Sequence, residues 1–178
     1  MRIVSGKYKS RRIKAPKHLP TRPTTDFAKE SLFNIINNLY YFEELRVIDL
    51  FAGIGSISFE FASRGAKNII SVDKHYACVK FIQGISDELQ MNLMVIKSDV
   101  YKFLGKTELK ADIIFADPPY NFDDNQFKEI YQQVFAKDML YENGMLIIEH
   151  SKHTNLSNLK NFSYTKKYGG NVFSFFEK

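Results

Sequence analysis

Cysteine and long apolar runs are what this sequence of 178 residues most clearly lacks. With Cys78 as its one cysteine, the chain cannot form an intramolecular disulfide or a cysteine-pair metal site, so nothing indicates secretion or structural zinc. No apolar run approaches the roughly 18 residues needed to cross a bilayer, and the first residues lack the apolar core of a signal peptide. We therefore expect a soluble cytoplasmic protein with no membrane segment, no bound metal and an inert, buried thiol. The histidines show no metal-ligand spacing and are expected to be structural or exposed: His18, His75, His150 and His153.

Excess positive charge is also missing from most of the chain. Residues 1–30 carry nine basic and two acidic side chains, a net charge of +7, whereas the remainder has a net charge of −2. A cationic segment on a nearly neutral body is the pattern expected of a protein that binds a polyanion such as nucleic acid. On charge alone, a lysine-rich terminus that only aids solubility is the alternative.

The chain after residue 45 alternates apolar runs with amphipathic stretches. The apolar runs are 46–52, 68–73, 93–99, 111–117 and 144–151, and the amphipathic stretches lie near 55–64, 75–89, 99–105 and 124–137. This alternation indicates a mostly parallel sheet covered by helices on both faces. Two further strand-like runs flank Gly169-Gly170, a strong signal for a two-residue hairpin turn. We predict an α/β fold: a Rossmann-like, doubly wound, mostly parallel seven-stranded sheet with an antiparallel C-terminal hairpin.

Two regions are predicted along the chain, a basic N-terminal arm (residues 1–23) and a ligand-binding domain (residues 24–178). The arm is expected to form a small β-hairpin with a strand on each side of Gly6, followed by a proline-rich loop. A helix should begin after Thr24 or Thr25, because a threonine can cap it and the following apolar residues recur at helical spacing.

A pair of glycines follows the first predicted strand, in the sequence DLFAGIG from Asp49 to Gly55. Gly53 and Gly55 let the backbone approach a ligand closely and open a helix whose amide end attracts negative charge. A dinucleotide site would need a third glycine, but this position is Ser58, which weakens an NAD interpretation. Taken alone, the pair is equally typical of a tight turn.

Two more aspartates end the next two predicted strands. Asp73 lies 20 positions after Gly53, the spacing at which an acidic side chain can accept hydrogen bonds from ribose hydroxyls. Asp99 ends the third strand, where it would meet the edge of a purine. Each could simply cap a strand or helix, but their order along the chain after Asp49 predicts S-adenosylmethionine as cofactor. The residues predicted to bind it are Asp49, Phe51, Gly53, Gly55, Asp73, Lys74, Ser98 and Asp99.

The fourth predicted strand ends in Asp117-Pro118-Pro119-Tyr120, the predicted catalytic residues. An amine on a nucleobase or amide has a delocalised lone pair, so it must be oriented to attack a sulfonium methyl group. Asp117 can accept one amine hydrogen and the Pro118 carbonyl the other, which favours the pyramidal nitrogen of the transition state. Tyr120 would stack on the flat group that carries the amine. A proline-terminated strand with a surface aspartate is the structural alternative.

Over essentially its whole length, the chain resembles the bacterial class I S-adenosylmethionine methyltransferases that modify the exocyclic N2 amine of a guanine in small-subunit (16S) ribosomal RNA. The resemblance rests on the segments RIVSGKYKSRRIKAP, TRPTTDFAKESLFN, DLFAGIGSISFEFASRGA, IIFADPPY and YGGN, in this order. It implies that residues 117–120 hold the guanine amine, that the aspartates and glycines above line the cofactor site, and that residues 22–26 lie near its entrance. The chain departs from the family pattern at Ser10, where glycine is expected, and at Ser56 and Ser58.

The predicted partner is small-subunit ribosomal RNA or the assembling 30S particle, bound by a monomer. The predicted RNA-binding residues are Lys7, Lys9, Arg11, Arg12, Lys14, Arg22 and Thr25. The same strand end would also serve a DNA or protein-amide N-methyltransferase, but DNA enzymes of this type usually carry an added domain, and a protein substrate leaves the basic arm unexplained. A non-catalytic RNA-binding assembly factor on the same scaffold is the remaining alternative.

Overall fold

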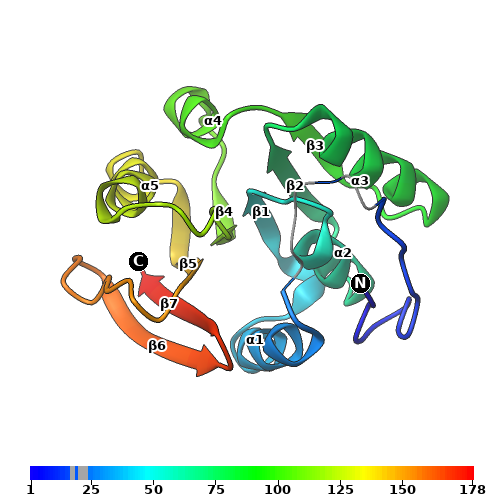
Figure 1. The fold of residues 1–178 in the computed structure, drawn as a ribbon, viewed down its shortest axis with the longest axis horizontal. Coiled ribbons are helices and arrows are strands. Elements are labelled where there is room, and N and C mark those ends of the chain that lie inside the picture. Colours follow the sequence, from blue (N-terminus) through cyan, green and yellow to red (C-terminus); the bar gives the residue numbers. More distant parts are fainter. Residues whose placement is uncertain (17–18, 20–23) are drawn as a thin grey trace.

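A seven-stranded sheet forms the centre of the computed structural model, which describes residues 1–16, residue 19 and residues 24–178 (Figure 1). The strands lie in the order β3-β2-β1-β4-β5-β7-β6. Their bounds are β1 Arg46–Leu50, β2 Asn68–Asp73, β3 Met94–Lys97, β4 Ala111–Ala116, β5 Leu140–His150, β6 Phe162–Tyr168 and β7 Asn171–Glu177. Strands β1 to β5 pair in parallel, whereas β7 is antiparallel to both β5 and β6. The predicted sheet is confirmed.

Helices cover both faces of this sheet. Their bounds are α1 Asp26–Leu39, η1 Phe42–Glu44, α2 Ser56–Ser63, α3 Tyr76–Glu88, α4 Val100–Lys106 and α5 Asp124–Ala136. Helices α1, α2 and α3 pack on one face of the sheet and α4 and α5 on the other (Figure 1). The first three helices cover one buried apolar cluster, and the other two cover a second. Among the described residues, every helix is too short or too polar to cross a membrane.

Strand β4 is enclosed on both faces of the sheet. Ile113 and Phe115 belong to the cluster beneath α1 to α3, while Ile114 and Ala116 belong to the cluster beneath α4 and α5. Alternate side chains of a strand point to opposite faces, so this four-residue apolar run fills both layers. The next side chain, Asp117, belongs to neither apolar cluster and follows directly after the end of the strand.

The C-terminal hairpin turns at Gly169-Gly170, as predicted. Gly169 has a φ of +63°, and the turn joins Tyr168 of β6 directly to its partner Asn171 of β7. Strand β7 lies between β5 and β6, so the hairpin forms one edge of the sheet. This arrangement places Asn171 at the same end of the sheet as the end of β5.

The arm differs from the expected β-hairpin. A single antiparallel bridge between Arg2 and Arg12 joins its ends, and the residues between them turn without forming strands. Ser10, the residue found where glycine was expected, has a φ of +68°, in the left-handed region that glycine favours. Ile3 and Ile13 are buried in the same apolar cluster as the inner face of α1, so the arm packs onto the body.

Helix α2 binds the arm through hydrogen bonds and a close backbone contact. The backbone N–H groups of Val4 and Ser5 donate to the two carboxylate oxygens of buried Glu60, at 2.8 and 3.0 Å. Gly6 has a φ of +80°, and a Cβ atom there would lie 1.8 Å from the carbonyl oxygen of Ser63. Only glycine can make this close approach, which explains why the arm bends at this position.

Candidate active site

A cavity of about 450 Å³ opens at the carboxyl ends of β1, β2 and β4. The strand order reverses between β1 and β4, and ligands of open α/β sheets bind beside such a reversal. The cavity brings together most of the residues predicted for cofactor binding and catalysis. Those in its lining are Asp49, Phe51, Gly53, Asp73, Lys74, Asp99, Asp117, Pro118, Pro119 and Tyr120. Of the predicted set, Gly55 and Ser98 lie outside the lining, and Gly55 instead begins α2 with a φ of +77°.

Asp49 is buried at the end of β1 and is held by the helix that follows. The backbone N–H and the hydroxyl of Ser58 both donate to Asp49 Oδ2, at 3.1 and 2.5 Å. Burial raises the pKa of the Asp49 carboxyl to about 7, although the hydrogen bonds from Ser58 act to lower it. Ser58 thus replaces the third glycine of a dinucleotide loop with a donor to this carboxylate.

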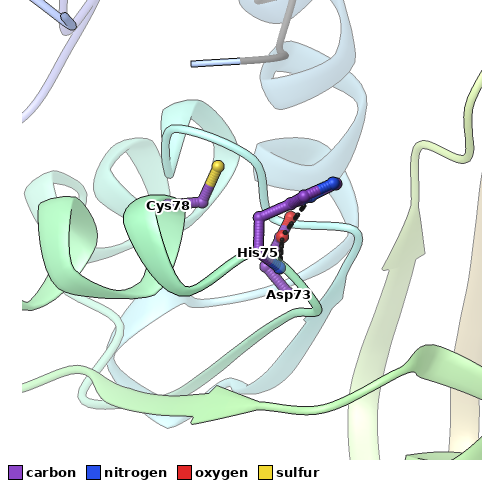
Figure 2. A group of neighbouring side chains, drawn as sticks. All are labelled: Asp73, His75 and Cys78. Carbon is purple, nitrogen blue, oxygen red and sulfur yellow. Dashed lines mark hydrogen bonds and ion pairs between the residues drawn. The ribbon is translucent and has the colours of Figure 1, made fainter. Parts of the chain in front are cut away.

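Asp73 holds two loops of the cavity, the one that follows β1 and the one that follows β2. Its Oδ2 accepts the N–H of Gly53 at 2.9 Å, and its Oδ1 accepts the N–H of His75 at 2.8 Å and lies 3.1 Å from His75 Nδ1. Figure 2 shows this pair with Cys78, whose sulfur completes a group of potential metal ligands within 4.8 Å of one another. Burial, together with the nearby charge of Asp73, raises the pKa of the Cys78 thiol to about 11. His75, which the sequence spacing did not connect with a site, lines the cavity.

The third side of the cavity comes from the start of α4. Asp99 is the N-cap of this helix and accepts the N–H of Lys102 at 3.2 Å. A carboxylate offers about four positions that can accept a hydrogen bond, so Asp99 can cap the helix and still accept hydrogen bonds from a ligand. Ser98, behind it, donates its hydroxyl hydrogen to the Asp99 carbonyl at 2.9 Å and supports this turn.

Asp117 stands at the tip of β4 and lines the cavity. Its backbone N–H lies 3.4 Å from the carbonyl of Leu50, which ties the tip to the neighbouring strand β1. Within the described part of the chain, neither a hydrogen bond nor an ion pair engages its carboxylate. Burial, and then the nearby charges of Glu149 and Asp49, raise the pKa of Asp117 well above its usual value. This acceptor can therefore take a hydrogen from a ligand without losing another partner.

Aromatic rings surround the wall next to Asp117. Phe51, a non-glycine residue with a φ of +62°, meets Phe122 edge to face at 5.5 Å, and Phe122 stacks on Tyr101 at 6.4 Å. Tyr120 lies at the mouth of the cavity and is 62% exposed. Tyr101 and Phe122 also line the cavity, a role that was not predicted from the sequence. These rings supply a flat apolar wall of the kind that receives a planar group.

Glu149, which the sequence analysis also missed, lies beside Asp117 because β4 and β5 pair in parallel register up to this point. It is only 2% exposed. Thr24 donates its hydroxyl hydrogen to Glu149 Oε2 at 3.0 Å, and the side-chain amide of Asn171 donates to Oε1. Thr24 lines the cavity, whereas Glu149 lies behind it. The sequence did contain one signal, since Glu149 follows an apolar run as Asp73 and Asp117 do.

The basic residues of the arm lie at the surface. Lys7, Lys9, Arg11, Arg12 and Lys14 are exposed, and Arg22 lies outside the described residues. Arg12 and Lys14 line a second cavity of about 840 Å³, which shares Ile54 with the first. Thr25 caps α1 by accepting the N–H of Ala28 at 3.2 Å. Their contact with RNA stays a prediction, as does the boundary between arm and domain.

Comparison with known proteins gives four matches. The family model described as Conserved hypothetical protein 95 matches residues 1–177. YlbH of Bacillus subtilis (strain 168), provisionally named an rRNA methyltransferase, is 35% identical over 161 residues, covering 88% of this chain and 85% of its own. Ribosomal RNA small subunit methyltransferase D of Buchnera aphidicola subsp. Baizongia pistaciae is 31% identical over 156 residues, covering 87% of this chain and 78% of its own. A solved Thermus thermophilus 16S rRNA N2 methyltransferase, in complex with AdoMet and guanosine, has a TM-score of 0.71 at 22% identity, covers 90% of this chain and 45% of its own, and so shares the Rossmann-like fold.

Proposed function

The chain belongs to the Conserved hypothetical protein 95 family, and we propose that it transfers a methyl group from S-adenosylmethionine to the exocyclic N2 amine of a guanine in small-subunit ribosomal RNA. The observation that carries this proposal is Asp117, a residue of the cavity lining whose carboxylate is engaged by no hydrogen bond or ion pair within the described residues. Two relatives whose names refer to rRNA methylation support the substrate class. The cationic arm supports a nucleic acid over a protein substrate.

The residues on the β1, β2 and β3 side fit the cofactor. The cavity volume of about 450 Å³ lies within the range of small-molecule sites, and carboxylates stand at the ends of successive strands. Asp73 would accept the ribose hydroxyls while it holds the Gly53 loop, and Asp99 would face the purine edge. Gly53 and Phe51 would border the amino-acid end, and Lys74 the exposed rim. When bound, S-adenosylmethionine supplies the electrophilic methyl group.

The β4 tip would hold the nucleophile. The N2 amine of guanine is flat and its lone pair is delocalised into the ring, so orientation has to make it reactive. Asp117 accepts one amine hydrogen and the Pro118 carbonyl accepts the second, which directs the lone pair at the methyl group. As the nitrogen attacks, positive charge develops on it, and the adjacent carboxylate stabilises this charge. Asp117 thus acts through position and charge, and it is the first acceptor available for the proton that the amine must lose.

The mouth of the cavity would receive the base. A guanine must leave its stack to reach Asp117, and an aromatic side chain can replace part of the lost stacking. Tyr120 is exposed at this mouth and would cover one face of the base, with Pro119 beside it. Phe122 would close the opposite wall.

Identification of the methylated nucleoside tests this proposal directly. The protein is incubated with labelled S-adenosylmethionine and either naked 16S RNA or 30S particles from cells that lack it, and the RNA is digested and analysed by mass spectrometry. We expect N2-methylguanosine at a single position, formed far more slowly by Asp117→Asn. Methyl transfer to another base, to DNA or to protein would overturn the proposal.

The arm has its own test. Contacts with phosphates release counterions, so RNA affinity should fall steeply with salt. Replacing Arg11, Arg12 and Lys14 together by alanine should flatten that slope by about 2 to 3 units in the log–log plot. A matched control replaces Lys106, Lys110 and Lys152, which are also exposed but lie outside the arm. An equal change of slope in both variants would remove the arm from the RNA interface.

A further inference from the structure

Thr24, Glu149 and Asn171 form a hydrogen-bonded chain behind the cavity that the proposed mechanism does not use. Thr24 and Glu149 are 125 positions apart in the sequence, and both are nearly fully buried, at 7% and 2% exposure. Thr24 lines the cavity that also contains Asp117, and Glu149 lies in register beside the β4 tip. Two buried polar side chains joined in one network at this place call for a role that involves the cavity.

The direction of these hydrogen bonds follows from the groups involved. A side-chain amide nitrogen can only donate, so Asn171 obliges Glu149 Oε1 to accept. Oε2 then accepts from the Thr24 hydroxyl at 3.0 Å. Burial raises the pKa of both carboxyls, but Glu149 accepts two hydrogen bonds that act to lower its pKa, whereas Asp117 accepts none among the described residues, so the ionised form is better supported in Glu149.

This direction decides what Thr24 can offer to a ligand. A threonine hydroxyl has one hydrogen and two acceptor lone pairs. Because the hydrogen is directed at Glu149, only lone pairs remain for the cavity. Thr24 is therefore a hydrogen-bond acceptor toward any group that enters, as is Asp117.

We propose that Thr24 is a specificity-determining residue that accepts the N1–H of guanine while Asp117 and Pro118 accept the N2 amine, with Glu149 as the positioning residue that holds the Thr24 hydroxyl in this direction. The inference rests on the proposed function. Guanine presents two adjacent donors, N1–H and the N2 amine, along the edge that would enter the cavity. A purine whose N1 is unprotonated would place an acceptor against the acceptor Thr24, and an unpaired polar contact of this kind disfavours binding.

The test uses a base analogue that separates the two donors. 2-Aminopurine keeps the N2 amine of guanine but has an unprotonated N1. RNA substrates with guanine or 2-aminopurine at the modified position are compared as kcat/KM for methyl transfer. We expect the wild-type protein to prefer guanine by about tenfold to a hundredfold, the usual discrimination of one good base-edge contact.

Three variants then identify the residues responsible. Thr24→Val, which keeps the shape but has no hydroxyl, should reduce the preference to near unity, and Thr24→Ser should retain it. In Glu149→Gln, the new amide oxygen accepts from Asn171, so the new NH₂ donates to Thr24 and turns its hydroxyl hydrogen toward the cavity. This variant should favour 2-aminopurine over guanine. Thermal melting and cofactor affinity, which should change little, control for misfolding.

The possible failures are distinguishable. No transfer to guanine by the wild-type protein would overturn the proposed function and this inference together. Transfer to guanine with equal rates on 2-aminopurine would overturn the inference alone, as would a guanine preference that survives Thr24→Val. A reversed preference in Glu149→Gln would be difficult to obtain from a merely structural role of the network.

Discussion

Carboxylates stand on both sides of the cavity, but the protein satisfies them very differently. On the β1–β2 side, Asp49 and Asp73 accept hydrogen bonds from backbone and side-chain donors. On the β4–β5 side, Glu149 accepts two such bonds, whereas none within the described residues reaches Asp117. Acidic residues at one edge of the sheet thus have two uses. Asp49 and Asp73 hold the loops on one side of the cavity, whereas Asp117 on the other side keeps its carboxylate available to a ligand.

The difference has an energetic consequence. A carboxylate that loses water without gaining protein donors destabilises the folded protein, and its pKa rises because desolvation disfavours the charged form. Asp117 retains this energetic cost. At Asp73 the hydrogen bonds from Gly53 and His75 offset the cost, and they also anchor two loops. Residues kept for a ligand at a cost in stability are typical of active sites.

The largest effect should follow from removing the Asp117 carboxylate, which accepts no hydrogen bond from the described residues. Asp117→Asn is expected to reduce kcat for methyl transfer about 100-fold to 1,000-fold, because an amide is neutral and would place a donor against the amine. The same variant should melt at a higher temperature than the wild type at pH 8. Transfer of labelled methyl groups and differential scanning calorimetry measure the two effects, with Asp124→Asn on the exposed start of α5 as control. A fully active Asp117→Asn protein would show that the carboxylate on the β4–β5 side is not needed for catalysis, contrary to the comparison above.

A smaller effect is expected on the satisfied side. Asp73→Asn offers one acceptor oxygen where two are used, so it should weaken S-adenosylmethionine binding about tenfold to a hundredfold. Titration calorimetry measures this affinity, and RNA affinity should not change. Asp87→Asn, on an exposed turn of α3, is the matched control. If the Asp73 variant bound the cofactor normally, the carboxylate would serve the loops alone.

The pH dependence of the reaction should report Asp117 in the same way. Because its pKa is raised and its ionised form accepts the amine, kcat/KM should rise with pH through that pKa, by about tenfold per unit on the acid limb. Stability should change in the opposite direction. A carboxyl whose folded pKa exceeds its unfolded value stabilises the fold below the unfolded pKa, and this contribution is lost as pH rises through the folded pKa. A rate that falls over this range would contradict the assignment.

The smallest effect concerns Ser58. Removing its hydroxyl in Ser58→Ala takes one donor from Asp49 and one partner from Ser71, which should cost about 1 kcal/mol of unfolding free energy. Asp49 has a pKa of about 7, so the loss should be larger at pH 8, where the carboxylate is charged, than at pH 5. Urea unfolding at the two pH values checks this, and equal losses would show that Ser58 does not support the ionised form.

Local patterns predicted the parts of the site that lie within one strand and the turn after it. The apolar run before Asp117 indicated a strand enclosed on both faces, and Ile113 to Ala116 do fill both apolar layers. Asp49, Asp73 and Asp99 were expected at strand ends because parallel strands share one carboxyl edge, and all three line the cavity. The two-residue turn at Gly169-Gly170 was equally readable, since turn chemistry is local.

Predictions about the arm were less successful for a physical reason. Alternating residues around Gly6 suggested two strands, yet the backbone groups of Val4 and Ser5 are satisfied by Glu60 of α2 instead of by a partner strand. Lys29, which is buried on α1, donates a hydrogen bond from its ammonium group to the Arg2 carbonyl. Which partner a backbone N–H finds depends on the body against which it packs, and no pattern within the arm contains that information.

The sequence by itself determined the order of strands and helices, the hairpin and the Asp-Pro-Pro-Tyr tip, because these follow from backbone periodicity and turn chemistry over a few neighbouring residues. Only the tertiary structure decided that Thr24 donates to Glu149 and that Asp117 is left without a donor among the described residues. Hydrogen bonds form or fail over a few tenths of an ångström, and such distances between remote segments are set by packing and strand register.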